Sequence, residues 1–240
     1  EAGAKRNPED FALWKGHKAS EPDTASWSAP WGAGRPGWHL ECTAMATKYL
    51  GSSFDIHGGG MDLRFPHHEN ELAQARAAGD GYANHWLHNA LVTVQGNKMS
   101  KSLGNGVLAA EMLAHARPLV IRYALASAHY RSELDLHEGF LAEAGTAFGR
   151  IESFLARAET QGITTAGGEI PEAFAQAMDD DLGIPAALAV LHDTVRQGNH
   201  AADESASDAF VTAAKQVRAM LAVLGLDPLD SQWDKDPGSD

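Results

Sequence analysis

Four consecutive segments in the first half of the chain alternate between helical and extended patterns, and this alternation limits the fold more than any other feature. Residues 38–50 have a helical pattern, and an apolar strand at 54–57 runs into three glycines. A second helix is expected to begin at Pro66 and to stop at Gly79, and a second strand follows at roughly 87–94. Because this order is typical of a parallel sheet covered by helices, we predict an α/β layer.

The second half of the sequence is almost wholly helical. Apolar residues recur every three or four positions in two stretches, 141–155 and 210–224, which gives each helix one apolar face. A further helix at 184–197 completes a small bundle. The α/β layer lacks opening strands, so it corresponds to half of a nucleotide-binding domain. The predicted domains are the latter part of a nucleotide-binding domain at 1–105, a helical connection at 106–136, the all-α bundle at 137–226 and a flexible tail at 227–240.

Composition restricts the compartment and the partners. The net charge of -13 opposes simple nucleic-acid binding, because phosphate contacts need Lys and Arg. Most of the excess acid lies after residue 136, so a local basic patch on the first half stays open. No apolar stretch reaches the roughly 18 residues that a membrane span needs, and the charged residues 1–10 do not fit a signal peptide. We expect a soluble, cytoplasmic protein with no membrane partner.

A thiol, an imidazole and a carboxylate form the first candidate site. Cys42 is the only cysteine, so it has no disulfide partner within the chain. His67 and Glu71 are four residues apart on a predicted helix and therefore share a face. This set can hold zinc. Spacing alone favours a buried thiol and a polar helix start instead, since the long interval after Cys42 matches no zinc-finger pattern, and His68 is an equally good ligand.

Two further segments suit a nucleotide. Residues 98–102 (KMSKS) place two ammonium groups and two hydroxyls in a short segment after a predicted strand, which suits a polyphosphate. The glycines at 58–60 allow close backbone approach, and Asp62 places a carboxylate where it can accept from ribose hydroxyls. From the residues alone, a solvated basic turn better explains any one pair of lysines, and glycine turns of this kind often serve only the backbone.

Four segments, taken together and in order, resemble the successive signatures of cysteinyl-tRNA synthetases, which are class I aminoacyl-tRNA synthetases. These segments are Gly34–Cys42 (GRPGWHLEC), Phe54–Leu63 (FDIHGGGMDL), Phe65–Glu71 (FPHHENE) and Lys98–Asn105 (KMSKSLGN). The resemblance covers about residues 5–225. It implies the second half of a Rossmann-like class I synthetase catalytic domain, a stem-contact-like connection at 106–136 and a tRNA-binding-like helical bundle. It also implies a ligase that activates L-cysteine with ATP and transfers it to tRNA(Cys).

The resemblance assigns a role to each candidate residue. It makes Cys42, His67 and Glu71 ligands of Zn²⁺. It places Trp38 and His57 in the cysteine pocket. It assigns ATP, bound with Mg²⁺, to Gly60, Asp62, Lys98, Met99, Ser100, Lys101 and Ser102. Lys98 and Lys101 then act in catalysis by neutralising charge as pyrophosphate leaves. Zinc–thiolate coordination would select cysteine, because an apolar pocket separates such similar side chains by only about 1–3 kcal/mol.

The sequence departs from this family at its beginning. The family's first half, which contains a further Cys ligand and a His-x-Gly-His motif, is absent, so we expect a fragment that is inactive without the N-terminal half of the catalytic domain. One alternative is the cysteine ligase of mycothiol biosynthesis, which joins cysteine to an amino sugar. That ligase has Gln in place of His57 and departs from Asn70 and Glu71, which favours the synthetase. A second alternative is a non-catalytic zinc-binding fragment.

Overall fold

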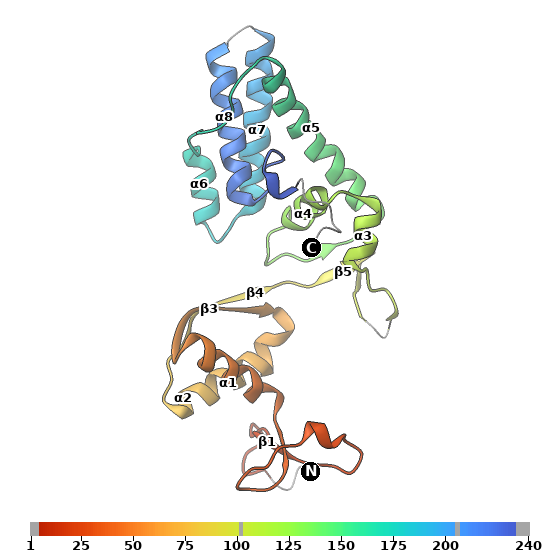
Figure 1. Cartoon of the computed structure of the whole chain (residues 1–240), viewed down its shortest axis with the longest axis vertical. Coiled ribbons are helices and arrows are strands. Elements are labelled where there is room, and N and C mark those ends of the chain that lie inside the picture. The colour runs from red at the N-terminus through yellow and green to blue at the C-terminus, as the bar shows by residue number, and fades with distance from the viewer. Residues whose placement is uncertain (1–4, 101–102, 205–206, 234–240) are drawn as a thin grey trace. The chain divides into compact units, whose positions relative to one another are not determined.

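The computed structural model describes residues 5–100, 103–204 and 207–233 (Figure 1). Lys101 and Ser102 of the predicted ATP-binding segment therefore lie outside the described residues. The chain forms two compact units, Glu1–Asn89 and Ala90–Asp240. The domain boundaries expected at 105, 136 and 226 stay predictions.

A two-stranded parallel sheet with two helices forms the centre of the first unit. The elements, in chain order, are β1 (Trp14–Gly16), η2 (Asp23–Ala25), β2 (Gly34–Pro36), α1 (Trp38–Leu50), β3 (Ser53–Gly60), η3 (Met61–Leu63), η4 (Arg64–His68), α2 (Glu69–Ala78) and β4 (Tyr82–Asn89). β3 pairs with β4 in parallel, from Ser53 opposite Tyr82 to Gly60 opposite Asn89. The predicted parallel α/β layer is therefore confirmed.

Local sequence signals set the limits of both helices in this unit. α1 covers the predicted residues 38–50 and ends at Gly51, whose φ of 90° is unfavourable for a residue with a side chain. Phe65 is extended, with φ -138° and ψ 132°, so the helical run leading into α2 begins at Pro66. Gly79 caps α2 in the left-handed conformation with φ 94°. The sheet packs on these helices through a small core of Phe54, Ala75 and Tyr82.

The structure corrects two local expectations. The glycines at 58–60 continue strand β3, and the turn follows them at η3. The predicted strand at 87–94 is two strands in different sheets, because the Ala90 amide leaves the ladder and donates to the Tyr130 carbonyl. Strand β1, which lies before the predicted elements, pairs antiparallel with β2.

A three-stranded sheet and six helices form the described part of the second unit. Its elements are β5 (Val92–Val94), β6 (Asn97–Lys98), α3 (Ala109–His115), α4 (Pro118–Ala126), β7 (Leu134–Asp135), α5 (Phe140–Thr160), α6 (Glu172–Asp179), α7 (Ile184–Asp203), α8 (Ser207–Leu224) and η6 (Ser231–Trp233). The strand order is β6-β5-β7, in which β5 runs antiparallel to β6 and parallel to β7.

The helical bundle packs around one large apolar core. The apolar faces predicted at 141–155 and 210–224 belong to α5 and α8, and α7 packs beside α8 (Figure 1). The fully buried side chains in this core include Phe148, Ile151, Leu191, Phe210 and Val217. Burying each of these stabilises the fold by about 1.5–3 kcal/mol. Within the described residues, no helix is both long and apolar enough to cross a membrane.

Candidate metal and substrate site

The Glu71 carboxylate lies at the centre of the first unit and is fully buried. Its Oε2 accepts a hydrogen bond of 2.5 Å from the Tyr82 hydroxyl and lies 3.0 Å from His57 Nε2. Its Oε1 lies 2.8 Å from His67 Nε2. A buried carboxylate is costly unless other groups stabilise its charge, and here β3, η4 and β4 each contribute a group beside it.

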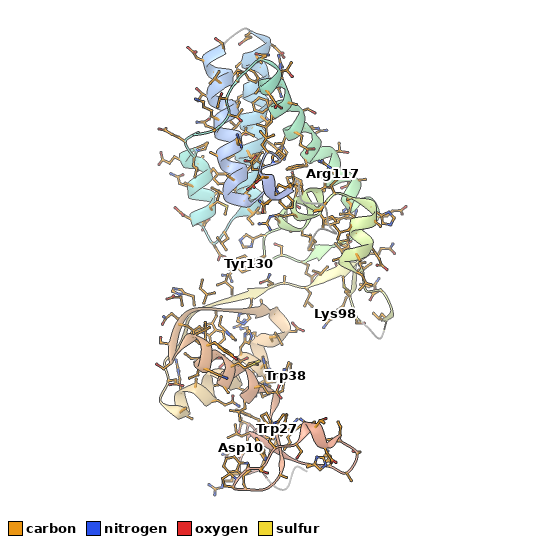
Figure 2. All side chains as sticks on the ribbon, viewed as in Figure 1. Asp10, Trp27, Trp38, Lys98, Arg117 and Tyr130 are labelled. Atoms are coloured by element: carbon orange, nitrogen blue, oxygen red, sulfur yellow. The ribbon has the colours of Figure 1, made fainter. Side chains whose placement is uncertain are left out.

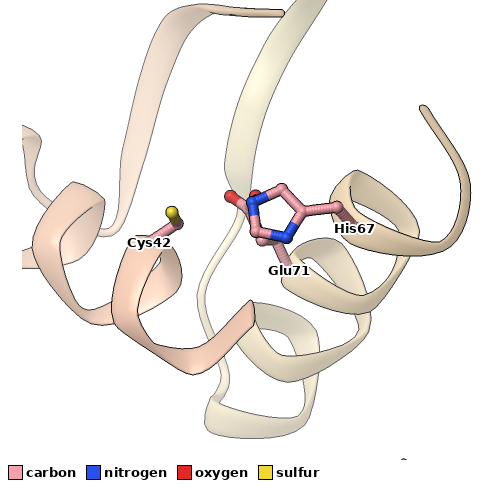
Figure 3. Close-up of side chains that lie close together, drawn as sticks. All are labelled: Cys42, His67 and Glu71. Atoms are coloured by element: carbon pink, nitrogen blue, oxygen red, sulfur yellow. The ribbon is translucent and has the colours of Figure 1, made fainter. Parts of the chain in front are cut away.

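Glu71 Oε1 nevertheless has no hydrogen-bond partner among the described residues. The His67 nitrogen is close enough, but the contact does not have the alignment of a hydrogen bond. One ligand atom each from Cys42, His67 and Glu71 lies within 4.8 Å of the other two. Figure 3 shows these three side chains. An unsatisfied carboxylate oxygen beside an imidazole nitrogen and a thiol is the arrangement of a cation site. The structure thus brings the three predicted ligands together.

Two aromatic neighbours on α1 orient the His67 ring. His67 Nδ1 lies 2.7 Å from His39 Nδ1, in a hydrogen bond whose direction depends on the tautomers. The Trp38 ring stacks on the His67 ring, with centroids 4.2 Å apart and planes at 27°. Because Nδ1 is engaged and the ring is clamped, Nε2 is directed at Glu71. Burial, followed by the neighbouring His67, lowers the pKa of His39, which favours its neutral form.

The Cys42 thiol is half-buried on α1. Burial, followed by the carboxylates of Glu71 and Glu41, raises its pKa above the ordinary value for cysteine. The protein groups alone therefore keep this sulfur protonated at neutral pH. A thiolate at Cys42 requires an additional positive charge at the site, which a bound cation supplies.

A second group of possible ligands shares the same carboxylate. His57, His68 and Glu71 also place ligand atoms within 4.8 Å of one another. His68 Nδ1 forms a 2.8 Å hydrogen bond with His88 Nε2. Burial and the neighbouring His57, His88 and His67 lower the pKa of His68 to about 4, so this ring is neutral at pH 7. Because Glu71 is common to both groups, they are alternatives around one anion.

Sequence reasoning missed several of the residues that hold this site. It assigned no role to His39, Tyr82 or His88, and it treated His68 only as a substitute ligand. A signal was present: the chain has 12 histidines, and Trp86 and His88 alternate along β4, which places them on one face of the strand. The partners of these side chains lie on other elements, and no local pattern identifies them.

Two glycines of β3 leave room for side chains that fold back on the strand. A Cβ on Gly59 would lie 2.9 Å from His68 Cε1 and 3.1 Å from Leu63 Cδ1. A Cβ on Gly60 would lie 2.5 Å from the Asp62 Oδ1 atom. The glycine run therefore permits His68 and Asp62 to approach the strand backbone.

The predicted ATP-binding lysine Lys98 belongs to the second unit, at the end of β6. The turn before it has positive φ at Gln95 (50°) and Gly96 (73°). Asp135 fixes this turn, since its Oδ1 accepts hydrogen bonds of 2.8 Å from the Gly96 amide and from Thr93 Oγ1. The Gly96 and Thr93 hydrogen bonds hold the pKa of Asp135 below its ordinary value. The turn thus presents Lys98 with an exposed side chain.

The residues after Lys98 are held by Asn105 and by an apolar cluster. Asn105 Oδ1 accepts a 2.9 Å hydrogen bond from the Ser100 amide, and Asn105 Nδ2 donates to the Lys98 carbonyl at 3.2 Å. Met99 is half-buried and packs against the cluster of Met112, Ile121 and Leu136. The described part of the KMSKS segment is therefore tethered at Lys98, Met99 and Ser100.

The comparisons with known proteins define the class of this fold. Residues 1–146 match the model of the class I (C) tRNA synthetase catalytic domain, and residues 173–228 match the DALR domain. The chain belongs to the class I (C) tRNA synthetase family. The predicted fold, a class I catalytic portion followed by a helical domain, is confirmed.

Two named relatives are similar to this chain over almost all of its length. The chain is 60% identical over 241 residues to the cysteine–tRNA ligase of Clavibacter sepedonicus, covering 96% of this chain and 50% of the relative. It is 59% identical over 231 residues to the cysteine–tRNA ligase of Streptomyces avermitilis, covering 95% of this chain and 49% of the relative. The chain thus spans about half the length of the curated relatives it matches.

A solved structure supports the same fold at low sequence identity. The LeuRS of Agrobacterium radiobacter, solved in a ternary complex with tRNA, matches with a TM-score of 0.62 and 12% identity. The match covers 89% of this chain and 35% of the LeuRS chain. This likeness concerns the fold alone.

Proposed function

We propose that this chain is part of a cysteine–tRNA ligase, which activates L-cysteine with ATP and transfers it to tRNA(Cys) in the cytoplasm. The observation that carries the proposal is the thiol, imidazole and carboxylate of Cys42, His67 and Glu71 around an oxygen without a hydrogen-bond partner. The names of relatives about 60% identical to this chain point to the same activity.

The residues present fit Zn²⁺ as the resident metal. A mixed sulfur, nitrogen and oxygen donor set is typical of zinc, whereas Mg²⁺ and Ca²⁺ prefer oxygen donors alone. These three ligands leave at least one coordination position, which the further Cys ligand implied by the family resemblance or a substrate thiolate can occupy. When bound, zinc supplies an acceptor for the substrate thiolate, and this distinguishes cysteine from serine and alanine by bond chemistry rather than by size.

The surrounding side chains orient these ligands and form the proposed cysteine pocket. His39 and Trp38 fix the His67 ring, and the Tyr82 hydroxyl holds one carboxylate oxygen of Glu71. The Trp38 side chain is 55% exposed, so part of its surface is free to contact a substrate. His57, beside Glu71 Oε2, offers a polar contact for the amino acid. These positions support the assignment of Trp38 and His57 to substrate binding.

The nucleotide is assigned to two segments of the chain. Gly60 allows close backbone approach, and the Asp62 carboxylate beside it can accept from the ribose hydroxyls. The segment Lys98–Ser102, with Mg²⁺ bound to the ATP, contacts the phosphates. The cysteine carboxylate attacks the α-phosphate and pyrophosphate leaves, while Lys98 and Lys101 neutralise the charge that develops. The helical bundle is assigned to the tRNA.

The direct test uses the full-length protein that contains this chain. The expected result is ATP–pyrophosphate exchange that depends on cysteine and is not supported by serine, followed by transfer of cysteine to tRNA(Cys). Transfer of cysteine to an amino sugar rather than to tRNA would point to the mycothiol ligase. Exchange with serine at a comparable rate would contradict selection through the thiol.

A further inference from the structure

Three consecutive residues of the second unit converge on one aspartate. Arg131 Nε lies 2.5 Å from Asp181 Oδ2, and Arg131 Nη2 donates to Oδ1 at 3.2 Å, which makes a two-pronged ion pair. The Tyr130 hydroxyl donates to Asp181 Oδ1 at 2.6 Å. His129 Nε2 lies 3.0 Å from the Asp181 carbonyl oxygen. We call these four residues the Asp181 clasp.

The backbone of the clasp is unusual as well. Asp181 and Leu182, between α6 and α7, both have positive φ, 54° and 56°, a conformation that residues with side chains rarely adopt. The arginine and aspartate side chains are 57% and 44% exposed. Exposed ion pairs contribute little to folding stability. A strained turn built around such a pair therefore points to a role in geometry.

The clasp joins the two regions that match different family models. Arg131 lies in the part that matches the catalytic domain, and Asp181 lies in the part that matches the DALR domain. The segment of Arg131 is itself fixed to the sheet, because the Tyr130 carbonyl accepts from the Ala90 amide and β7 pairs with β5. Figure 2 labels Tyr130 close to the turn between α6 and α7. The sheet connected to the clasp, β6-β5-β7, also carries Lys98.

Helix α4 makes a second set of contacts between these regions. Helix α4 contributes Leu119, Val120, Tyr123 and Ala124 to the core of the bundle. Arg122 of α4 donates to the Leu224 carbonyl at the end of α8, at 3.0 Å. The α4 contacts involve the long helices α5, α7 and α8, whereas the clasp holds the turn between α6 and α7.

We propose that Asp181 is a positioning residue for the transfer of cysteine to tRNA. It holds the α6–α7 turn of the bundle on the segment that leads into the sheet carrying Lys98, and so sets where the bundle holds the tRNA relative to the ATP loop. The inference rests on the proposed function, because tRNA is the acceptor. Misplacement of a substrate by about 1 Å costs about a hundredfold in rate, so a small change at this clasp has a measurable effect.

The test compares two neighbouring substitutions in the full-length protein. Asp181→Asn keeps an oxygen for Tyr130 and a residue that tolerates positive φ, but it removes the charge facing Arg131. We expect kcat/KM for tRNA in aminoacylation to fall by about tenfold to a hundredfold, while cysteine-dependent pyrophosphate exchange changes by less than about twofold. Asp180→Asn makes the same change of charge one residue earlier, on an exposed side chain, and should leave both activities unchanged.

Two further measurements separate a failed clasp from a failed function. Arg131→Lys keeps the charge but loses the two-pronged geometry. It should therefore also reduce transfer of cysteine to tRNA while leaving cysteine-dependent pyrophosphate exchange nearly unchanged. In the 240-residue chain, Asp181→Asn should accelerate amide hydrogen exchange at 129–131 and 180–184 relative to Asp180→Asn.

The positioning role is overturned if Asp181→Asn reduces pyrophosphate exchange and transfer to tRNA equally. It is also overturned if Asp181→Asn and Asp180→Asn behave alike. If Asp181→Asn accelerates amide hydrogen exchange but the unmodified protein has no cysteine-dependent activity, the clasp is supported. The proposed function and the role in tRNA positioning are then contradicted.

Discussion

His67 Nε2 lies 2.8 Å from Glu71 Oε1, yet this buried oxygen accepts no hydrogen bond among the described residues. Two ligand atoms that lie this close together without a hydrogen bond between them are expected where a cation completes their coordination. The Cys42 thiol, with its raised pKa, needs the same cation to become a thiolate. These two relationships make metal binding the property on which the Glu71 and His39 predictions rest.

Replacement of Glu71 by Gln should weaken zinc binding by at least about a hundredfold, because loss of a direct ligand costs no less than loss of a residue that supports one. The amide oxygen can still accept from Tyr82, so the fold should survive. Competition with a chelator measures the affinity. Glu69→Gln, at an exposed acid on the same helix, is the matched control and should bind zinc normally. Equal affinity in the two variants would remove Glu71 from the ligand set.

His39→Phe should reduce zinc affinity by about tenfold to a hundredfold, because His39 orients the metal ligand His67 through its Nδ1 atom. The aromatic ring is kept, so the packing near Phe11 changes little. His85→Phe alters an exposed histidine on β4 and serves as the control. The same chelator competition applies. Unchanged affinity in His39→Phe would mean that Trp38 stacking alone positions His67.

Local sequence signals predicted some features of this site, whereas contacts between distant elements could not be predicted from the sequence. The ends of α1 and the start of the helical run at Pro66 follow from local signals, and so does the shared helix face of His67 and Glu71. The approach of Cys42 was predicted only from the resemblance to a family. The His39–His67 contact and the Tyr82–Glu71 hydrogen bond join elements far apart in the chain, and periodicity carries no information about such partners.

The break between β4 and β5 illustrates the same limit. Residues 87–94 have a continuous extended pattern, but their hydrogen-bond partners change at Ala90, whose amide donates to Tyr130. A strand pattern reports which residues are extended and not which neighbour they pair with. The acidic run at 179–181 likewise carries no sign of its partner, and only the fold shows that Arg131 meets Asp181.

The Asp181 clasp should also make stability depend on pH. Hydrogen bonds from Arg131 and then Tyr130 lower the pKa of Asp181 to about 2. A carboxylate with a depressed folded-state pKa stabilises the fold above its unfolded value of about 4, and this contribution is lost as the pH falls toward 2. The difference in melting temperature between the wild-type chain and Asp181→Asn should therefore shrink as the pH is lowered from 6 to 3. A difference that grows over this range would contradict the ion pair.

Two glycines in the bundle should respond in opposite directions to alanine. A Cβ at Gly198 of α7 would lie 2.6 Å from Phe154 Cζ and 2.9 Å from Ala213 Cβ, so Gly198→Ala should destabilise the bundle by about 1–3 kcal/mol. A Cβ at Gly149 of α5 meets nothing within 4 Å, so Gly149→Ala should stabilise it by about 0.5–1 kcal/mol. Denaturant unfolding followed by far-ultraviolet circular dichroism measures both. Stabilisation by Gly198→Ala would show that the helices are not packed this closely.

X-ray absorption spectroscopy of the purified 240-residue chain loaded with one equivalent of Zn²⁺ tests the central claim most directly. The predicted spectrum contains one sulfur ligand at about 2.3 Å and nitrogen or oxygen ligands at about 2.0–2.2 Å. Cys42→Ser should remove the sulfur shell, whereas His68→Gln should leave the ligand shell unchanged. A spectrum without sulfur in the unmodified chain, or a shell altered by His68→Gln and not by His67→Gln, would contradict a metal site formed by Cys42, His67 and Glu71.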